Sequence, residues 1–173
     1  MEAVVAAARP GSREYQLEAA GTFAIMNGGG RVHLMMIGAT SMRDPRLVFP
    51  NPRPSRRVLQ EGDIIVPEIV ALYQGYSAKI GHPVTLGRPT KEVEKFFKEV
   101  TLGAFHALRE QLTPGKTLED VRKAGEHFRA HGAQTRPLMV HGLDLITATP
   151  FISIDQVKAR PSEMTIAPGM TFA

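Results

Sequence analysis

The sequence of 173 residues predicts an α+β fold, and two kinds of pattern carry this prediction. The first is a set of helical patterns, in which apolar residues recur every three or four positions. The second is a pair of apolar runs joined by Gln74-Gly75, which has the chemistry of a tight turn between antiparallel strands. In chain order these patterns give two helices, a strand, a hairpin, two helices and a strand, so helices should flank an antiparallel sheet.

The first half of the chain is predicted to contain two helices, the first of which ends before Arg9, followed by a strand and a hairpin. Ser12 can cap a helix that ends at a run of glycines and turns Leu17, Ala20 and Ala24 inward. Pro67 has no N–H to donate to a neighbouring strand, which places it at a sheet edge or a bulge. The other patterns of this half are a buried strand over residues 32–37, a proline-rich and arginine-rich loop over 43–57, and hairpin strands over 64–73 and 76–86.

The second half is predicted to contain two helices and two strands. The first helix follows Thr90 and carries an apolar stripe of Val93, Phe97, Val100, Ala104 and Leu108. The second helix begins after Thr117, where Asp120 stands in a capping-box position, and it ends at Gly132. Strand patterns follow over residues 138–145 and 164–173. Because the chain stops inside the last strand pattern, we expect residues 1–173 to form a single but partial domain.

Composition and charge exclude several classes of function. The absence of Cys excludes disulfides, thiolate metal sites and a cysteine nucleophile. The 21 Lys and Arg residues exceed the 17 Asp and Glu residues, giving a net charge of +4, which is too small for a dedicated nucleic-acid-binding surface. No apolar run reaches the length of a membrane span, and the first residues lack a secretion signal. We therefore predict a cytoplasmic protein without a membrane partner.

Four stretches of the sequence stand out by their order and spacing. They are Arg9-Pro10-Gly11-Ser12-Arg13-Glu14, Leu59-Gln60-Glu61-Gly62-Asp63-Ile64-Ile65, Tyr73-Gln74-Gly75-Tyr76, and Val140-His141-Gly142 with Pro168-Gly169-Met170-Thr171-Phe172. Together they resemble the pita-bread family of metallohydrolases, which includes methionine aminopeptidase, Xaa-Pro aminopeptidase, Xaa-Pro dipeptidase and creatinase. The Xaa-Pro peptidase and creatinase branch is nearer. The resemblance covers nearly the whole chain and implies a pita-bread fold and a homodimer.

The resemblance also implies a site for two divalent metal ions, held by two aspartates, one histidine and two glutamates. Carried over residue by residue, the first aspartate position falls on Glu68, which keeps the negative charge. The second falls on Lys79, which adds a cation instead. The histidine position is His141, and the two glutamate positions fall mostly past Ala173. If the domain is an active hydrolase, the resemblance leaves Glu68 and His141 as ligands for Mn, Co, Zn or Fe; otherwise no cofactor is expected.

The resemblance implies a depleted substrate pocket as well, because Asn51 and Ala148 stand where the family has histidines. We therefore expect a Xaa-Pro-peptidase-like domain with a degenerate dinuclear metal site, weak or absent catalysis, and a binding or regulatory role toward a small peptide or another small molecule. The alternative is an active metal-dependent aminopeptidase, dipeptidase or creatinase-like hydrolase that uses ligands beyond this chain. A third possibility is a basic nucleic-acid-binding module. A metal-free reaction is a further possibility, with Lys79 as its general base or nucleophile. The candidate catalytic residues are therefore Lys79 and His141.

Strand geometry gives Glu68 and Lys79 a structural explanation that is independent of the resemblance. If the hairpin turns about Tyr73 and Gln74, Lys79 lies directly opposite Glu68 on the same sheet face. If the turn is Gln74-Gly75, Lys79 becomes a diagonal neighbour that a long side chain still reaches. Both registers predict an ion pair between the two strands. His141 has a similar alternative as a hydrogen-bonded strand histidine.

Two other clusters also have a structural explanation beside a functional one. His127 and His131 have an i, i+4 spacing that can bind zinc, but the zincin glutamate is absent. We interpret them as side chains placed near a helix C-terminus, where the helix dipole favours positive charge. The arginine cluster of the loop can bind a phosphate or a carboxylate, or it can form a solvated surface. Its members are Arg43, Arg46, Arg53, Arg56 and Arg57.

Overall fold

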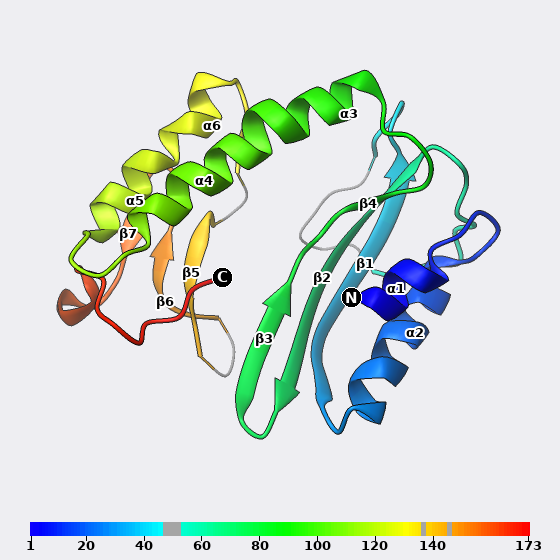
Figure 1. Ribbon diagram of the computed structural model, residues 1–173, viewed down its shortest axis with the longest axis horizontal. Coiled ribbons are helices and arrows are strands. Elements are labelled where there is room, and N and C mark those ends of the chain that lie inside the picture. Colours follow the sequence, from blue (N-terminus) through cyan, green and yellow to red (C-terminus); the bar gives the residue numbers. More distant parts are fainter. Residues whose placement is uncertain (47–52, 136–137, 145–146) are drawn as a thin grey trace. The chain divides into compact units, whose positions relative to one another are not determined.

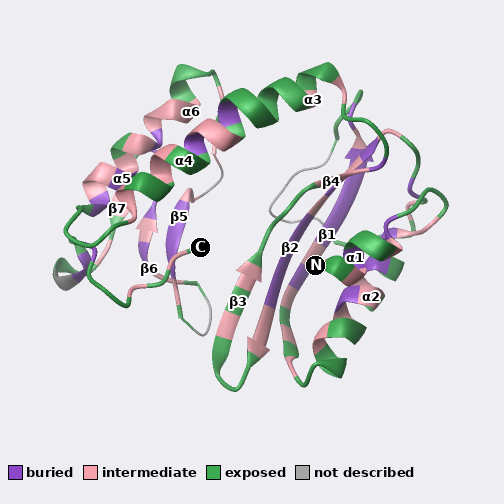
Figure 2. Ribbon diagram, in the orientation of Figure 1, coloured by how far each residue is buried: buried purple, intermediate pink, exposed green. Residues whose placement is uncertain are grey.

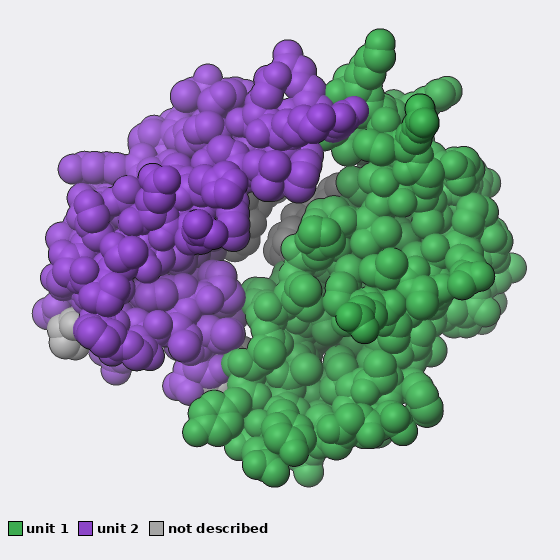
Figure 3. All heavy atoms as spheres, in the orientation of Figure 1, with its two compact units in different colours: residues 1–93 green, residues 94–173 purple. Residues whose placement is uncertain are grey.

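The computed structural model describes residues 1–46, 53–135, 138–144 and 147–173 of the chain. The chain divides into two compact units, Met1–Val93 and Glu94–Ala173, which Figure 3 shows in different colours. Each unit combines helices with an antiparallel sheet, so the α+β prediction is confirmed. The single domain over residues 1–173 stays a prediction.

The sheet of the first unit is built around one long central strand. Its strands are β1 (Arg31–Ser41), β2 (Asp63–Tyr73), β3 (Tyr76–Ile80) and β4 (Val84–Thr85). β1 pairs antiparallel with one edge of β2, while β3 and β4 pair in succession with the other edge (Figure 1). The predicted hairpin is therefore present, and the strand predicted over residues 32–37 is longer than expected.

Pro67 lies in the central strand, opposite Ile37 of β1, so the prediction of an edge or a bulge holds only locally, on the side of β2 that is unpaired between β3 and β4. A Cβ added at Gly81 would lie 3.3 Å from the Pro67 carbonyl oxygen, so this carbonyl faces the connection between β3 and β4. Because the N–H and C=O of one strand residue point to the same side, the missing N–H would also face that connection. The proline therefore stands where β2 has no paired strand on that side, and no ladder hydrogen bond is lost.

The helices α1 (Glu2–Ala7) and α2 (Glu14–Asn27) pack on one face of this sheet (Figure 1). Figure 2 shows that β1 and β2 carry most of the buried positions of the unit. Apolar side chains from alternate strand positions meet the helices there, because successive strand residues point to opposite faces. The fully buried members of this core include Val4, Leu17, Ile37, Leu59 and Ile65.

The buried face of α2 differs from the predicted face, which consists of Leu17, Ala20 and Ala24. The structure buries Glu14, Leu17 and Gly21. A Cβ added at Gly21 would lie 2.9 Å from Cγ2 of Val4 and 3.0 Å from Sδ of Met35. The glycine thus allows α1 and β1 to approach the helix closely, and this contact decides which face turns inward. The helix also begins after Arg13, whose N–H donates to Gln16 Oε1 at 2.7 Å, rather than after Ser12.

The long helix predicted after Thr90 contains a π-helical turn. It consists of α3 (Lys91–Phe96), the π segment η1 (Phe97–Thr101) and α4 (Leu102–Gln111). Val100 and Ala104 are buried as predicted, but Phe97 is 45% exposed. A π turn holds one residue more than an α turn, so the apolar stripe changes phase across it. The predicted single stripe is therefore wrong before Val100.

The two histidines with helical spacing bind backbone carbonyl groups. Nε2 of His127 lies 3.0 Å from the carbonyl oxygen of Glu99, within the π turn. Nδ1 of His131 lies 2.8 Å from the carbonyl oxygen of His127. Since a carbonyl oxygen only accepts, each of these nitrogens is the donor. This geometry gives both histidines a structural role and supports no zinc site.

Two short helices, α5 (Leu118–Ala124) and α6 (Glu126–Ala130), replace the single second helix predicted. The predicted capping box is confirmed, because the Asp120 N–H donates to Thr117 Oγ1 at 3.2 Å and the Thr117 N–H donates to Asp120 Oδ2 at 2.9 Å. The break falls at Gly125, where an added Cβ would lie 2.2 Å from Sδ of Met139. The end of the Met139 side chain packs directly against the backbone there.

The sheet of the second unit has the order β5 (Val140–Leu143), β6 (Thr147–Ile152), β7 (Val157–Lys158), and the 3-10 turn η2 (Pro161–Glu163) follows it. The strand predicted over residues 164–173 is present only as isolated bridges, one between Thr165 and Thr117 and one near its end. Phe172 forms an isolated bridge with Gly142, and Ala173 exchanges two backbone hydrogen bonds of 2.9 Å with His141. Gly169, with φ of +90°, turns the chain just before this pairing, which limits its length.

Membrane insertion finds no support in the helices of the described ranges, none of which combines the length and the apolar character that a spanning segment needs.

Candidate functional site

Glu68 lies in the middle of β2, opposite Met36 of β1. Its neighbours Ile65 and Ile69 point into the core beneath the helices. Because strand side chains alternate, Glu68 points to the opposite face of the sheet. The residue is nevertheless only 9% exposed, so its carboxylate needs hydrogen bonds or a counter-charge.

The turn between β2 and β3 determines which side chain supplies that charge. Gln74 and Gly75 have φ values of +47° and +87°, as a two-residue type I′ turn requires. The resulting register places Lys79 opposite Val70, which is the second of the two predicted registers. Lys79 is thus a diagonal neighbour of Glu68 on the same face, and its Nζ lies 2.6 Å from Glu68 Oε1. The side chains are 21% and 12% exposed, so the ion pair is largely shielded from water.

His141 lies on β5 in the second unit and is 6% exposed. Its Nδ1 is 2.8 Å from the carbonyl oxygen of Gly142, and its backbone pairs with Ala173. Since the carbonyl accepts, Nδ1 carries the proton, and in the neutral ring Nε2 holds the lone pair. The ring therefore has the tautomer that a metal-binding or ligand-binding histidine needs, in a position that strand pairing alone also explains.

The two predicted pocket residues have different outcomes. Ala148 lies opposite Gly142 in the register of β5 and β6. It lines a cavity of about 230 Å³ in the second unit, together with Asp144, Arg160 and Phe172. Asn51 lies outside the described residues. The structure thus brings Glu68 and Lys79 together in one unit and places His141 beside the Ala148 strand in the other.

The described residues do not form a metal-binding cluster. Within ranges 1–46, 53–135, 138–144 and 147–173, no three His, Asp or Glu side chains come together in a way that could hold a metal ion. The carboxylate of Glu68 already contacts an ammonium group. Two divalent ions normally need several carboxylates to offset their charge, so the residues present do not fit a dinuclear site.

A buried glutamate that the sequence analysis did not single out joins three parts of the first unit. Glu14, in the first turn of α2, is 4% exposed. Its Oε1 accepts from the N–H of Ala39 on β1, and its Oε2 accepts from the N–H of Ser55, both at 2.8 Å. Glu14 ends the first of the four stretches that the sequence analysis names, but its partners are 25 and 41 residues away.

The acidic residue of the Leu59-x-x-Gly62-Asp63 stretch has a similar structural task. Asp63 is 2% exposed, and its Oδ1 lies 2.6 Å from Nη2 of Arg57. Its Oδ2 accepts from the Gln60 N–H at 2.9 Å. Arg57 is therefore committed to an internal ion pair, and the arginine cluster of the loop is smaller as a surface than its sequence indicates.

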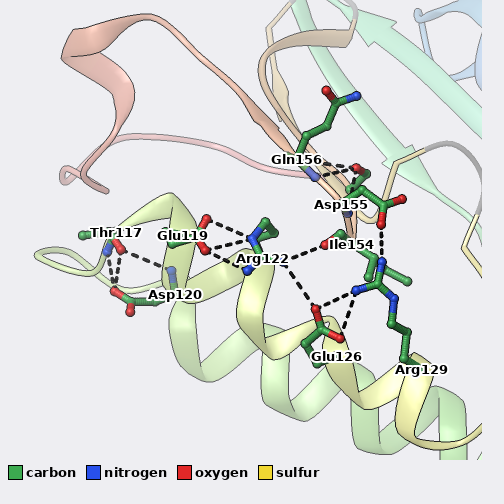
Figure 4. Close-up of polar contacts among 10 residues, drawn as sticks. Thr117, Glu119, Asp120, Arg122, Glu126, Arg129, Ile154, Asp155 and Gln156 are labelled. Carbon is green, nitrogen blue, oxygen red and sulfur yellow. Dashed lines mark hydrogen bonds and ion pairs between the residues drawn. The ribbon is translucent and has the colours of Figure 1, made fainter.

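A network of ion pairs connects the helices α5 and α6 with the turn after β6 (Figure 4). Arg122 contacts Glu119 and Glu126 and donates to the carbonyl oxygen of Ile154 at 2.8 Å. Arg129 contacts Glu126 and also Asp155. The i, i+3 and i, i+4 spacing of the helical members was a signal in the sequence. The contacts to the β6–β7 turn depend on the fold and could not be predicted from that spacing.

Comparison with known proteins assigns the chain to a family. The model of metallopeptidase family M24 matches residues 1–173. The chain belongs to metallopeptidase family M24. A curated relative of this M24 chain, methionine aminopeptidase from Staphylococcus epidermidis, is 30% identical over 71 residues, which are 41% of the chain and 28% of that enzyme.

Solved structures confirm the pita-bread fold of the M24 chain. Xaa-Pro dipeptidase from Bacillus anthracis matches with a TM-score of 0.80 and 18% identity, over 99% of this chain and 47% of that one. X-Pro aminopeptidase from Thermotoga maritima matches with 0.76 and 23%, over 99% and 51%. Prolidase from Pyrococcus furiosus matches with 0.78 and 20%, over 99% and 53%. The chain thus spans about half the length of these proteins.

The cavity near Ala148 contains an ion pair that makes the stability of the M24 chain depend on pH. Glu163 accepts from the Arg160 N–H at 2.9 Å and from Arg160 Nε at 2.6 Å, and Thr149 Oγ1 donates to it at 3.2 Å. The hydrogen bonds from Arg160 hold the pKa of the Glu163 carboxyl below its ordinary value of 4.5. The bonds stabilise the ionised form, so the folded state binds a proton less readily than the unfolded state does.

We expect the Glu163 contribution to be fully present above the unfolded pKa and to disappear as the pH falls through the lowered folded-state pKa. Glu163→Gln should therefore flatten the loss of stability between roughly pH 5 and pH 3. Urea unfolding at several pH values measures this slope. Glu92→Gln, at an exposed position of α3, is the control and should leave the slope unchanged. A slope that is equal in Glu163→Gln and the unaltered chain would contradict the prediction.

Proposed function

We propose that this chain is a Xaa-Pro-peptidase-like M24 domain in which an ion pair takes the place of metal-bound carboxylates, and that it binds peptide-like ligands with weak or no hydrolysis. The observation that supports the proposal is the 2.6 Å contact between Lys79 Nζ and Glu68 Oε1. These are the two positions that the family resemblance assigns to the metal-binding aspartates. Homodimer formation and a cytoplasmic location stay predictions.

The repulsion that Lys79 would exert on a bound metal ion favours this proposal over the hydrolase alternative. An ammonium group about 4 Å from a dication at an effective dielectric constant of 20 is repelled by roughly 8 kcal/mol, twice the value for two unit charges. The carboxylate of Glu68 would also have to leave Lys79 in order to bind the metal. A metal ion would therefore have to offset two unfavourable changes at one position.

The same contact argues against Lys79 as a general base or nucleophile. An ammonium group that donates to a carboxylate has no lone pair to offer to a substrate. His141 is different, because its Nδ1–H donates to Gly142 and its Nε2 is an acceptor in the neutral ring. The described wall of the small cavity includes Ala148 but not His141, so the catalytic and metal-binding roles of His141 stay predictions.

The test is a metal titration of purified protein prepared without chelators. The unaltered chain and three variants, Lys79→Asp, Lys79→Met and Lys91→Asp, are titrated with Mn²⁺, Co²⁺ and Zn²⁺, and the bound metal is measured by elemental analysis. We expect no stoichiometric metal in the unaltered chain and no shift of its Tm with Mn²⁺. Lys79→Asp should bind metal at least about tenfold more tightly, because it restores a carboxylate and removes a cation.

Lys91→Asp makes the same change of charge at an exposed position of the first unit, so it controls for net charge. Lys79→Met removes the cation without adding a ligand, so its metal affinity should lie between those of the unaltered chain and Lys79→Asp. One or two equivalents of metal in the unaltered chain, with a raised Tm, would overturn the proposal and support the hydrolase. A screen of Xaa-Pro dipeptides for hydrolysis would then follow.

A further inference from the structure

A cavity of about 610 Å³ lies entirely within the first unit, where β1 ends, β2 begins and the chain leaves β4. Its volume is in the range of small-molecule sites, which span about 300–1,000 Å³. Neither Glu68 nor Lys79 is part of its wall. The residues that line it are Ser41, Met42, Arg43, Glu61, Gly62, Arg88, Pro89 and Thr90.

Backbone hydrogen bonds hold the wall of this cavity in place. The Met42 N–H donates to the Gly62 carbonyl at 3.0 Å, and the Gly62 N–H donates to the Leu86 carbonyl at 2.8 Å. The side chains of Met42 and Leu86 are 7% and 6% exposed, so the three segments are anchored in the core. The backbone of the wall is therefore in place before a ligand arrives, which reduces part of the entropy cost of binding.

The charged side chains of the cavity are not used elsewhere in the described ranges. Two other arginines of the same loop are committed, because Arg46 pairs with Asp44 and Arg57 with Asp63. Among the residues that the structure describes, Arg43, Arg88 and Glu61 make no ion pair. Two guanidinium groups and one carboxylate thus remain available on the wall of one cavity.

The Glu61 side chain extends into the space beside Gly87. A Cβ added at Gly87 would lie 1.9 Å from Glu61 Oε1, so the carboxylate occupies the space that any other residue would fill. Gly87 also has φ of +87°, which favours glycine for a second reason. The negative charge of Glu61 thus lies beside Gly87, which directly precedes Arg88 in the chain.

We propose that this cavity binds a free α-amino acid as a zwitterion, with its carboxylate between Arg43 and Arg88 and its ammonium group at Glu61. Guanidinium groups recognise carboxylates through paired hydrogen bonds, and the hydroxyls of Ser41 and Thr90 add donors. The carboxylate of Glu61 favours a ligand with a cationic end over a plain dianion such as phosphate. Apolar contact from Met42 and Pro89 suits an amino acid with an aliphatic side chain.

Calorimetric titration with L-leucine tests the proposal, and three further compounds separate its parts. N-acetyl-L-leucine lacks the ammonium group, L-leucinamide lacks the carboxylate, and inorganic phosphate supplies an anion alone. We expect L-leucine to bind at least about tenfold more tightly than each of the three. Tighter binding of phosphate, or equal binding of all four, would overturn the proposal.

Substitutions in the cavity wall test whether L-leucine binds there. Arg43→Gln and Arg88→Gln should each weaken L-leucine binding by about tenfold or more, and Glu61→Gln should remove the preference for L-leucine over its N-acetyl form. All three positions are exposed, so these proteins should fold. Arg31→Gln, at the opposite end of β1, is the matched control and should change nothing. Equal affinity in Arg88→Gln and Arg31→Gln would overturn the assignment.

The proposal is independent of the Glu68–Lys79 ion pair. Lys79→Met should therefore leave L-leucine binding unchanged, whatever that variant does to metal binding. A loss of L-leucine binding in Lys79→Met, with normal binding in Arg88→Gln, would move the ligand to the other site and overturn the inference.

Discussion

Glu14→Ala is expected to lower the free energy of unfolding by about 3–5 kcal/mol. The carboxylate accepts two backbone hydrogen bonds of 2.8 Å, from Ala39 and Ser55, and the residue is 4% exposed. A hydrogen bond to a charged group contributes about 1.5–3 kcal/mol, and the substitution removes two of them. It also leaves the Ala39 N–H buried without an acceptor, so the contact between α2 and β1 should loosen.

Equilibrium unfolding in urea measures this loss, with two further variants for comparison. Glu14→Gln keeps one amide oxygen and nearly the same volume, so it should lose less stability than Glu14→Ala. Glu18→Ala, one turn further along α2, controls for the helix itself, and we expect a change within about 0.5 kcal/mol. A loss below about 1 kcal/mol in Glu14→Ala would show that the carboxylate does not join the three segments in solution.

The second large effect is expected at the ion pair of the hairpin, where Lys79→Met should cost about 2–3 kcal/mol. Removing one partner of a fully buried ion pair costs about 3–5 kcal/mol, because an uncompensated charge remains in the interior. The side chains of Glu68 and Lys79 are 12% and 21% exposed, so water stabilises the remaining carboxylate in part and the lower range applies. The loss should come mainly from the charge of Glu68, since methionine retains much of the volume of the lysine side chain.

A double-mutant cycle isolates this pair. Glu68→Gln in the Lys79→Met background should cost little further stability, and we expect a coupling energy of about 1–3 kcal/mol. The exposed pair of Glu94 and Lys98 has a similar contact of 2.5 Å, with side chains 48% and 65% exposed. Lys98→Met should therefore cost less than about 1 kcal/mol. Equal effects at both pairs would mean that burial does not strengthen the hairpin pair.

The sequence predicts the parts of the fold that local chemistry determines. Gln74-Gly75 predicts a tight turn because two adjacent residues must adopt positive φ, and the structure has this turn. Thr117 and Asp120 predict a capping box because their two hydrogen bonds close over three residues. Neither feature depends on the rest of the chain.

Features that depend on distant partners were predicted poorly. The inward face of α2 is set by the close approach of Val4 and Met35 to Gly21, which helical periodicity cannot show. The π turn gives the Glu99 carbonyl a histidine partner 28 residues later. At the candidate site the same division holds. The Glu68–Lys79 contact follows from a short hairpin, whereas the partners of Glu14 come from separate segments.

The π turn and the hairpin turn give this chain opposite tolerances to a change in length. A π segment holds one residue more than an α-helix needs, so a deletion within residues 97–101 would leave an ordinary helical turn that still connects α3 with α4. The two-residue turn at Gln74-Gly75 has no extra residue, so a deletion there must change the strand register. A shift of one residue reverses the side-chain directions of the whole of β3 and carries Lys79 to the core face of the sheet, away from Glu68. Homologous chains that keep this ion pair should therefore vary in length in the helix and not in the hairpin.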